Sequence, residues 1–199
     1  MAYYTGYVDI PHDSYNQWKN ATNGNGYNYD FLHGCQYYDL LIEFWYNVGF
    51  PQGYPLIANG SAYSMWENRQ ENASYNGVTY FDLVYDMYDI QVGDIVVFNQ
   101  TSGNNGQVGF ADVNFSDSGW SYPDLPILSQ GNGGYPDPQG GAYTNINTYS
   151  LINTQSAQNV FLGAFRYRAW HEVPPTPSAE VKRTHFKWAI YANKIRKRY

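Results

Sequence analysis

Residues 93–115 read GDIVVFNQTSGNNGQVGFADVNF, and this stretch decides the fold class. Its two apolar runs, residues 94–99 and 107–115, are rich in β-branched and aromatic side chains, which is typical of strands. Between them lies GNNG at residues 103–106, and glycine and asparagine at such a point indicate a hairpin turn. The stretch therefore predicts two antiparallel strands joined at residues 103–106.

Outside this hairpin, helical spacing comes first along the chain and strand-like runs follow. Helices are predicted at residues 39–48, where Gly49 and Pro51 provide the stop, and at 62–70. Further strands are predicted at residues 78–83, 125–130 and 160–167. Helices followed by a run of antiparallel strands indicate an α+β domain with its N-terminal helices packed on the sheet. We expect its core to include Phe98, Phe110, Phe115 and Phe165.

The C-terminal part differs from the rest of the chain. Residues 1–172 are expected to form the domain, 173–178 (VPPTPS) a proline-rich linker, and 179–199 a basic amphipathic helix. Seven of the 11 Lys and Arg residues lie at 182–199, which has no Asp or Glu. This helix could dock on a protein, bind an anionic polymer or fold back on the acidic body. Docking is favoured because it also uses the apolar stripe, formed by Val181, His185, Trp188, Ala192, Ile195 and Tyr199.

Composition excludes several classes of protein. The chain has 199 residues and a net charge of −6, with 14% charged and 19% aromatic residues. One cysteine excludes an internal disulfide framework and a cysteine-based zinc cluster. No apolar run is long enough to span a bilayer, and the first residues lack the pattern of a secretory signal. The acidic body disfavours nucleic acid as a partner.

Several segments, in order, resemble the CHAP domain, the cysteine, histidine-dependent amidohydrolase/peptidase module of phage and bacterial cell-wall lysins. These are residues 23–40 (NGNGYNYDFLHGCQYYDL), 61–99 with its GDIVVF run, 106–113 (GQVGFADV) and 161–166 (FLGAFR). The resemblance covers residues 14–168 and implies a papain-like fold of the NlpC/P60 type. It also implies that amide bonds of peptidoglycan are the family's substrate.

The resemblance places other residues where the family has its catalytic ones. Tyr37 stands where the nucleophilic cysteine belongs, in QYYDL, and Gln107 where the histidine base belongs. The strand that supplies the third, orienting residue reads LSQGN here, so that position is displaced to Gln130. A phenol with a pKa of about 10 is a poor nucleophile at neutral pH, and a carboxamide cannot accept and return a proton. We therefore expect no catalysis from these positions.

Cys35 is the alternative nucleophile, two residues before the family position. Two residues turn a helical side chain by about 200°, towards a different face. None of His12, His33, His171 and His185 precedes a strand in the way that Gln107 does. A small buried thiol is the favoured interpretation of Cys35, and an active lysin that uses it is the competing one.

Two other groups of residues suggest ligands. Asn28, Asp30 and Asp39 fall where calcium-dependent members of the family have oxygen ligands. An Asx-rich turn with Asp39 capping the next helix needs no ion and is favoured, so no cofactor is expected. Exposed aromatic residues beside glycine-rich loops could stack on sugars or pack internally, and neither is favoured. They are Trp120, Tyr122, Tyr135 and Tyr143.

The leading hypothesis is an inactive CHAP-like protein that binds a surface polymer or is architectural, anchored through residues 179–199. Its groove would lie near Tyr37, Gln107 and Gln130. A phage particle, as a tail or capsid component made in the host cytoplasm, fits the missing signal. The alternative is an active peptidoglycan amidase or endopeptidase using Cys35.

Overall fold

The computed structural model describes residues 14–27, 37–50, 61–100, 103–117, 124–131, 144–150 and 159–171. The α-helices are α1 (Tyr15–Thr22), α2 (Tyr37–Asn47), α3 (Ala62–Glu67), α4 (Arg69–Asn72) and α5 (Arg168–His171), with 3-10 helices η1 (Met87–Asp89) and η2 (Phe115–Asp117). The strands are β1 (Ser74–Tyr75), β2 (Val78–Thr79), β3 (Phe81–Val84), β4 (Ile95–Gln100), β5 (Gly103–Ala111), β6 (Asp124–Ser129), β7 (Asn145–Ser150) and β8 (Asn159–Tyr167).

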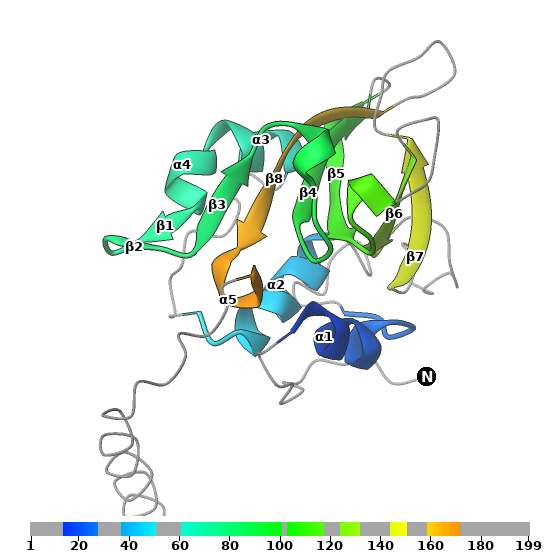
Figure 1. Ribbon diagram of the computed structural model, residues 1–199, viewed down its shortest axis with the longest axis horizontal. Coiled ribbons are helices and arrows are strands. Elements are labelled where there is room, and N and C mark those ends of the chain that lie inside the picture. Colours follow the sequence, from blue (N-terminus) through cyan, green and yellow to red (C-terminus); the bar gives the residue numbers. More distant parts are fainter. Residues whose placement is uncertain are drawn as a thin grey trace, which may run out of the picture.

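Six of the strands form one antiparallel sheet in the order β3-β8-β4-β5-β6-β7, and β1 pairs with β2 separately. Figure 1 shows α1 and α2 close together beside the sheet, and α3 and α4 near β3. This arrangement confirms the predicted α+β class. No helix among the described residues is long and apolar enough to cross a membrane.

Alternation along β4 divides the core between the two faces of the sheet. Ile95 and Val97 belong to the larger cluster, which also contains Trp18 of α1, Leu40 and Phe44 of α2 and Met65 of α3. Val96 and Phe98 belong to a second cluster with Ile90, Leu125 and Ile127. Successive side chains of a strand point to opposite faces, so α1, α2 and α3 cover one face. The segment that carries η1 and η2 packs against the other.

Short-range signals explain where the helices begin and end. The Ser14 hydroxyl accepts a hydrogen bond from Gln17 N at 3.3 Å, and the Ser61 hydroxyl accepts one from Ser64 N at 3.0 Å. Both serines are therefore N-caps. After α2, Gly49 has a φ of 73°, a left-handed conformation that glycine adopts without strain. The predicted stop at Gly49 is confirmed.

Some sequence predictions were wrong in detail. The segment 103–106 is no turn, because β5 begins at Gly103, which pairs with Gln100. β5 ends at Ala111, and Phe115 belongs to η2. The predicted helix 62–70 is divided at Asn68, whose side chain donates to the Ser64 carbonyl at 2.9 Å. Asn68 N also donates to that carbonyl at 3.1 Å, and the break comes from the backbone of Asn68, whose ψ of 25° departs from helical geometry.

Several elements were not predicted, and one predicted strand is divided. The elements without a predicted counterpart are α1, β1, η1, η2, β7 and α5, and the predicted strand 78–83 is β2 followed by β3. β7 reads NINTYS, whose polar side chains give no core-facing pattern of the kind that predicts a strand. Three of the phenylalanines expected in the core (Phe98, Phe110 and Phe165) are buried, and Phe115 packs against the second cluster. The linker and helix predicted at residues 173–199 lie outside the described residues.

Candidate functional site

Tyr37, which the resemblance places at the family's nucleophile position, is the first residue of α2. Its side chain is half-buried against the larger core cluster, which includes Val108, the residue after Gln107. Burial raises the pKa of the Tyr37 phenol above its ordinary value of 10.0, and a backbone hydrogen bond with Ala62 opposes only part of that rise. The phenol therefore stays protonated at neutral pH and is no nucleophile there.

Gln107, which the resemblance places at the position of the histidine base, lies on β5 and is 4% exposed. Its Nε2 donates to the backbone carbonyl of Gln130 at 3.4 Å. The structure thus brings Gln107 and Gln130 together. No hydrogen bond joins Gln107 to Tyr37 in the part of the chain that the structure describes.

The side chain of Gln130 is fully buried and holds three segments together. Its Oε1 accepts from Tyr27 N at 3.0 Å and from the Thr144 hydroxyl at 3.0 Å. Its Nε2 donates to the Tyr27 carbonyl at 2.7 Å. Thr144 is tied to the same loop by backbone bonds, accepting from Gly24 N at 2.7 Å and donating to Asn25 O at 2.9 Å. Gln130 therefore fixes Tyr27, in the loop that follows α1, against the end of β6.

Asp39 is the third residue of α2 and 1% exposed, so it lies inside the first turn and is not the cap. One and two turns along the same helix, Glu43 and Asn47 are also buried, and Asn47 Nδ2 donates to Glu43 Oε1 at 2.6 Å. No group of three His, Cys, Asp or Glu able to hold a metal occurs among the residues that the structure describes. The other proposed ligands, Asn28 and Asp30, lie outside those residues.

The remaining predicted site residues also fall outside the described ranges. They are the alternative nucleophile Cys35, the loop aromatics Trp120, Tyr122, Tyr135 and Tyr143, and the docking stripe Val181, Trp188, Ala192, Ile195 and Tyr199. Each of these stays a prediction.

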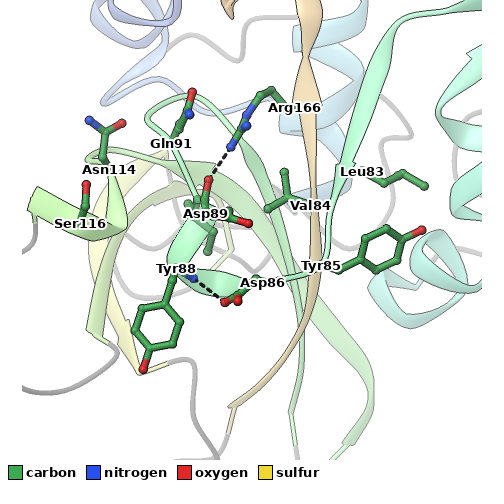
Figure 2. Close-up of a pocket in the computed structure, with 11 residues that line it drawn as sticks. Leu83, Val84, Tyr85, Asp86, Tyr88, Asp89, Gln91, Asn114, Ser116 and Arg166 are labelled. Atoms are coloured by element: carbon green, nitrogen blue, oxygen red, sulfur yellow. Dashed lines mark hydrogen bonds between the residues drawn. The ribbon is translucent and has the colours of Figure 1, made fainter.

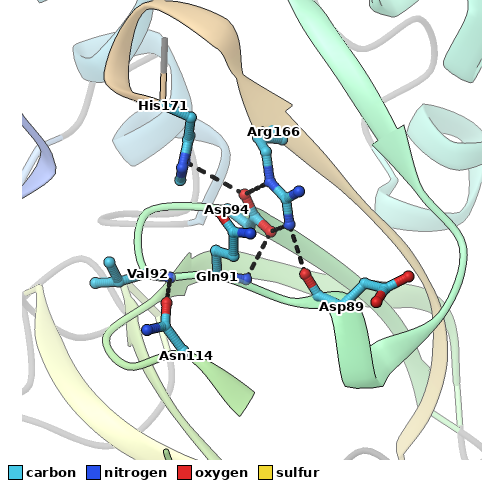
Figure 3. A network of polar contacts seen from close by, with 7 residues as sticks. All are labelled: Asp89, Gln91, Val92, Asp94, Asn114, Arg166 and His171. Carbon is cyan, nitrogen blue, oxygen red and sulfur yellow. Dashed lines mark hydrogen bonds and ion pairs between the residues drawn. The ribbon is translucent and has the colours of Figure 1, made fainter. Parts of the chain in front are cut away.

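A buried charge network holds the turn before β4 (Figure 3). Asp94, which is fully buried, accepts from Arg166 Nε at 3.0 Å and Arg166 Nη2 at 2.8 Å, and from Gln91 N at 2.8 Å. His171 Nε2 lies 3.5 Å from Asp94 Oδ1. Burial raises the pKa of Asp94, although Arg166 opposes the rise, and burial lowers the pKa of His171. The aspartate of the GDIVVF run is therefore a structural residue that orders this turn.

A pocket of about 570 Å³ opens beside this network, between β3, η1, η2 and β8 (Figure 2). Its lining is mostly polar, and two of its residues, Tyr85 and Tyr88, are among the exposed large side chains of the protein. None of Tyr37, Gln107 and Gln130 lines it. This pocket was not predicted from the sequence. The one local signal was YDMYD at residues 85–89, where tyrosines and carboxylates alternate closely.

Comparison with known proteins finds similarity both in sequence and in structure. No family model matches the chain. Over 91 residues, the chain is 35% identical to the D-alanyl-L-alanine endopeptidase of Streptococcus phage B30. Over that segment the chain is related to a phage endopeptidase. The match covers 45% of this chain and 19% of that endopeptidase, so the chain spans about a fifth of that relative's length.

The fold comparison points the same way. The crystal structure of the wild-type endolysin LysIME-EF1 superposes with a TM-score of 0.52 at 16% identity, covering 92% of this chain and 83% of the endolysin. Helices packed on a six-stranded antiparallel sheet are therefore common to both. The two relations support the resemblance to a CHAP-like lysin domain.

Proposed function

We propose that this chain is a catalytically inactive relative of the phage endolysins that binds a cell-wall polymer without cutting it. The observation that carries the proposal is the pair of side chains at the family's catalytic positions, a protonated phenol at Tyr37 and a buried carboxamide at Gln107. We further propose that the chain is part of a phage particle, held there by residues 179–199.

The chemistry of amide hydrolysis in this family supports inactivity. The reaction needs a thiolate that attacks the amide carbon, and an imidazole that takes the thiol proton and returns it to the leaving amine. Tyr37 keeps its proton at neutral pH, and Gln107 Nε2 is itself a donor to the Gln130 carbonyl. Removal of either member of such a pair abolishes most of the rate.

The second candidate is an active endopeptidase that uses Cys35. The 35% identity to the phage D-alanyl-L-alanine endopeptidase favours it. In that case Cys35 would need a histidine base from elsewhere in the chain, since Gln107 cannot serve.

Release of soluble peptides from purified cell walls distinguishes the two. We expect no release by the wild-type protein and no effect of Cys35→Ser, whereas retention of the protein on sedimented walls is expected. Peptide release that needs a reducing agent and is lost in Cys35→Ser would establish the enzyme and end the proposal. The double variant Tyr37→Cys/Gln107→His shows in parallel whether the scaffold still supports the family's chemistry.

Anchoring is tested separately by deletion of residues 179–199. The shortened protein should keep the melting temperature of the full chain but be absent from purified particles. A shortened protein that still co-purifies with particles would contradict the anchoring role.

A further inference from the structure

The pocket between β3, η1, η2 and β8 points to a ligand, and we infer that it is a carbohydrate site for a neutral sugar chain. Tyr85 and Tyr88 would be its stacking platforms. The pocket adjoins the end of the β4–β5 ladder that begins with the Ile95–Phe110 pair, and Gln107, which pairs with Phe98, lies farther along that ladder and outside the pocket. Its volume falls within the 300–1,000 Å³ that is usual for small-ligand sites.

The two tyrosine rings are exposed and nevertheless held in place. Tyr85 is 58% exposed, and its ring contacts the Trp66 ring edge-on at 5.7 Å, with the Arg69 guanidinium 5.9 Å from its centroid. Tyr88 is 66% exposed and meets Phe115 edge-on at 5.1 Å. A ring that is already fixed loses little conformational freedom when a ligand covers it. Tyrosine also combines an apolar face with a hydroxyl, which suits the faces and hydroxyls of a sugar.

The turn between the two rings is equally well ordered. Asp86 caps η1 by accepting from Tyr88 N at 2.9 Å, and Ile90, 1% exposed, anchors the end of the turn in the second core cluster. Phe115 N donates to the Ile90 carbonyl at 2.9 Å, joining η2 to the same wall. Arg166 Nη2 donates to the Asp89 carbonyl. These bonds preorganise the pocket, which a weak, many-contact ligand such as a glycan requires.

The polar lining favours an uncharged sugar. Asp86, Asp89, Gln91, Asn114, Ser116 and Arg166 place carboxylates, amides, a hydroxyl and a guanidinium around the cavity. The charge of Arg166 is balanced by the buried Asp94, which leaves Asp86 and Asp89 to set the sign of the lining. Carboxylates accept hydrogen bonds from sugar hydroxyls and N-acetyl groups, whereas they repel a polyanion. A neutral glycan is therefore the ligand class that fits both rings and charges.

This inference rests on the proposed function only in taking a cell wall as the source of the sugar chain. The proposed function and the sugar site can therefore fail separately. Peptide release from walls would end the proposed inactivity while leaving sugar binding by the pocket measurable. Conversely, wall binding that survives loss of both tyrosine rings would leave the proposed function standing and exclude this pocket as its site.

The test is titration of the full chain with neutral tetrasaccharides of N-acetylglucosamine, glucose and mannose, followed by nuclear magnetic resonance or calorimetry, with inorganic polyphosphate as the polyanion. We expect one of the neutral probes to bind and polyphosphate not to. Tyr85→Ala and Tyr88→Ala should each weaken binding about tenfold, because each removes one aromatic stacking contact. Tyr85→Phe and Tyr88→Phe keep the ring and should bind within about twofold of the wild type.

The chain offers a matched control. Tyr46 on α2 and Tyr63 on α3 are each 42% exposed and do not line the pocket, so their alanine variants should bind like the wild type. Since all four tyrosines are at the surface, unchanged melting temperatures check that the variants fold. Equal affinity of the pocket and control variants, or no binding of any neutral tetrasaccharide at 10 mM (about the upper end of useful weak affinities), would overturn the inference.

Discussion

Gln130 carries three buried hydrogen bonds, and its replacement by alanine is expected to destabilise the protein by about 3 kcal/mol. The change removes the hydrogen bonds that Gln130 makes with the Tyr27 N–H, the Tyr27 carbonyl and the Thr144 hydroxyl, in a region where Tyr27, Gln130 and Thr144 are fully buried. One intramolecular hydrogen bond contributes about 0.5–1.5 kcal/mol to stability. Three bonds at the centre of that range give the figure.

Urea unfolding followed by tryptophan fluorescence measures this loss, since Trp18 is buried in the core and reports on it. With a slope of about 2 kcal/mol per molar urea, the midpoint should fall by roughly 1.5 M with the slope unchanged. The control is Gln17→Ala on the exposed side of α1, which should change stability by no more than about 0.5 kcal/mol. A Gln130→Ala protein within about 1 kcal/mol of the wild type would refute the structural role given to Gln130.

Three other changes test the core and the charge network. Arg166→Met leaves the carboxylate of Asp94 buried without its ion pair and should cost about 3–5 kcal/mol in urea unfolding, whereas a loss under 1 kcal/mol would contradict the burial of Asp94. Burial lowers the pKa of His171 in the folded protein. Below about pH 6.5 the imidazole therefore takes up a proton in the unfolded chain before it does so in the folded protein, and stability falls as the pH drops towards the folded-state pKa. His171→Gln should flatten that part of the pH dependence, and an identical profile would show that His171 does not contribute. Gly163→Ala places a methyl group against the ring of Trp66 and should cost about 1–3 kcal/mol of stability. If this overlap is the cause, the same substitution should cost less in a protein that already carries Trp66→Ala.

Much of the fold could be predicted because its signals are local. Helical spacing predicted α2, apolar runs bounded by turn residues predicted β4, β6 and β8, and the identities of Gly49 and Pro51 predicted the end of α2. The hairpin turn was misplaced because glycines and asparagines at 103–106 are typical of turns, while the pairing of Gln100 with Gly103 draws them into β5. Strand pairing, which is a tertiary interaction, overrides such local preference.

The candidate site was only partly accessible to sequence. Tyr37 and Gln107 were predicted as site residues from the register of the family resemblance. The three bonds of Gln130 were not, because two of them go to the backbone of Tyr27, 103 residues away. The pocket was missed for the same reason: residues 83–91, residues 114–116 and Arg166 meet there only after folding.

The identity of the side chains, which the sequence gives directly, determined what chemistry Tyr37 and Gln107 can supply: a phenol and a carboxamide provide neither a thiolate nor an imidazole. Burial and proximity were decided by the tertiary structure alone. The packed core raises the pKa of Tyr37, and folding encloses Gln130 and sets Tyr85 and Tyr88 around one cavity. The physical reason is that pKa, desolvation and ligand contact depend on neighbours in space, and those neighbours come from distant parts of the chain.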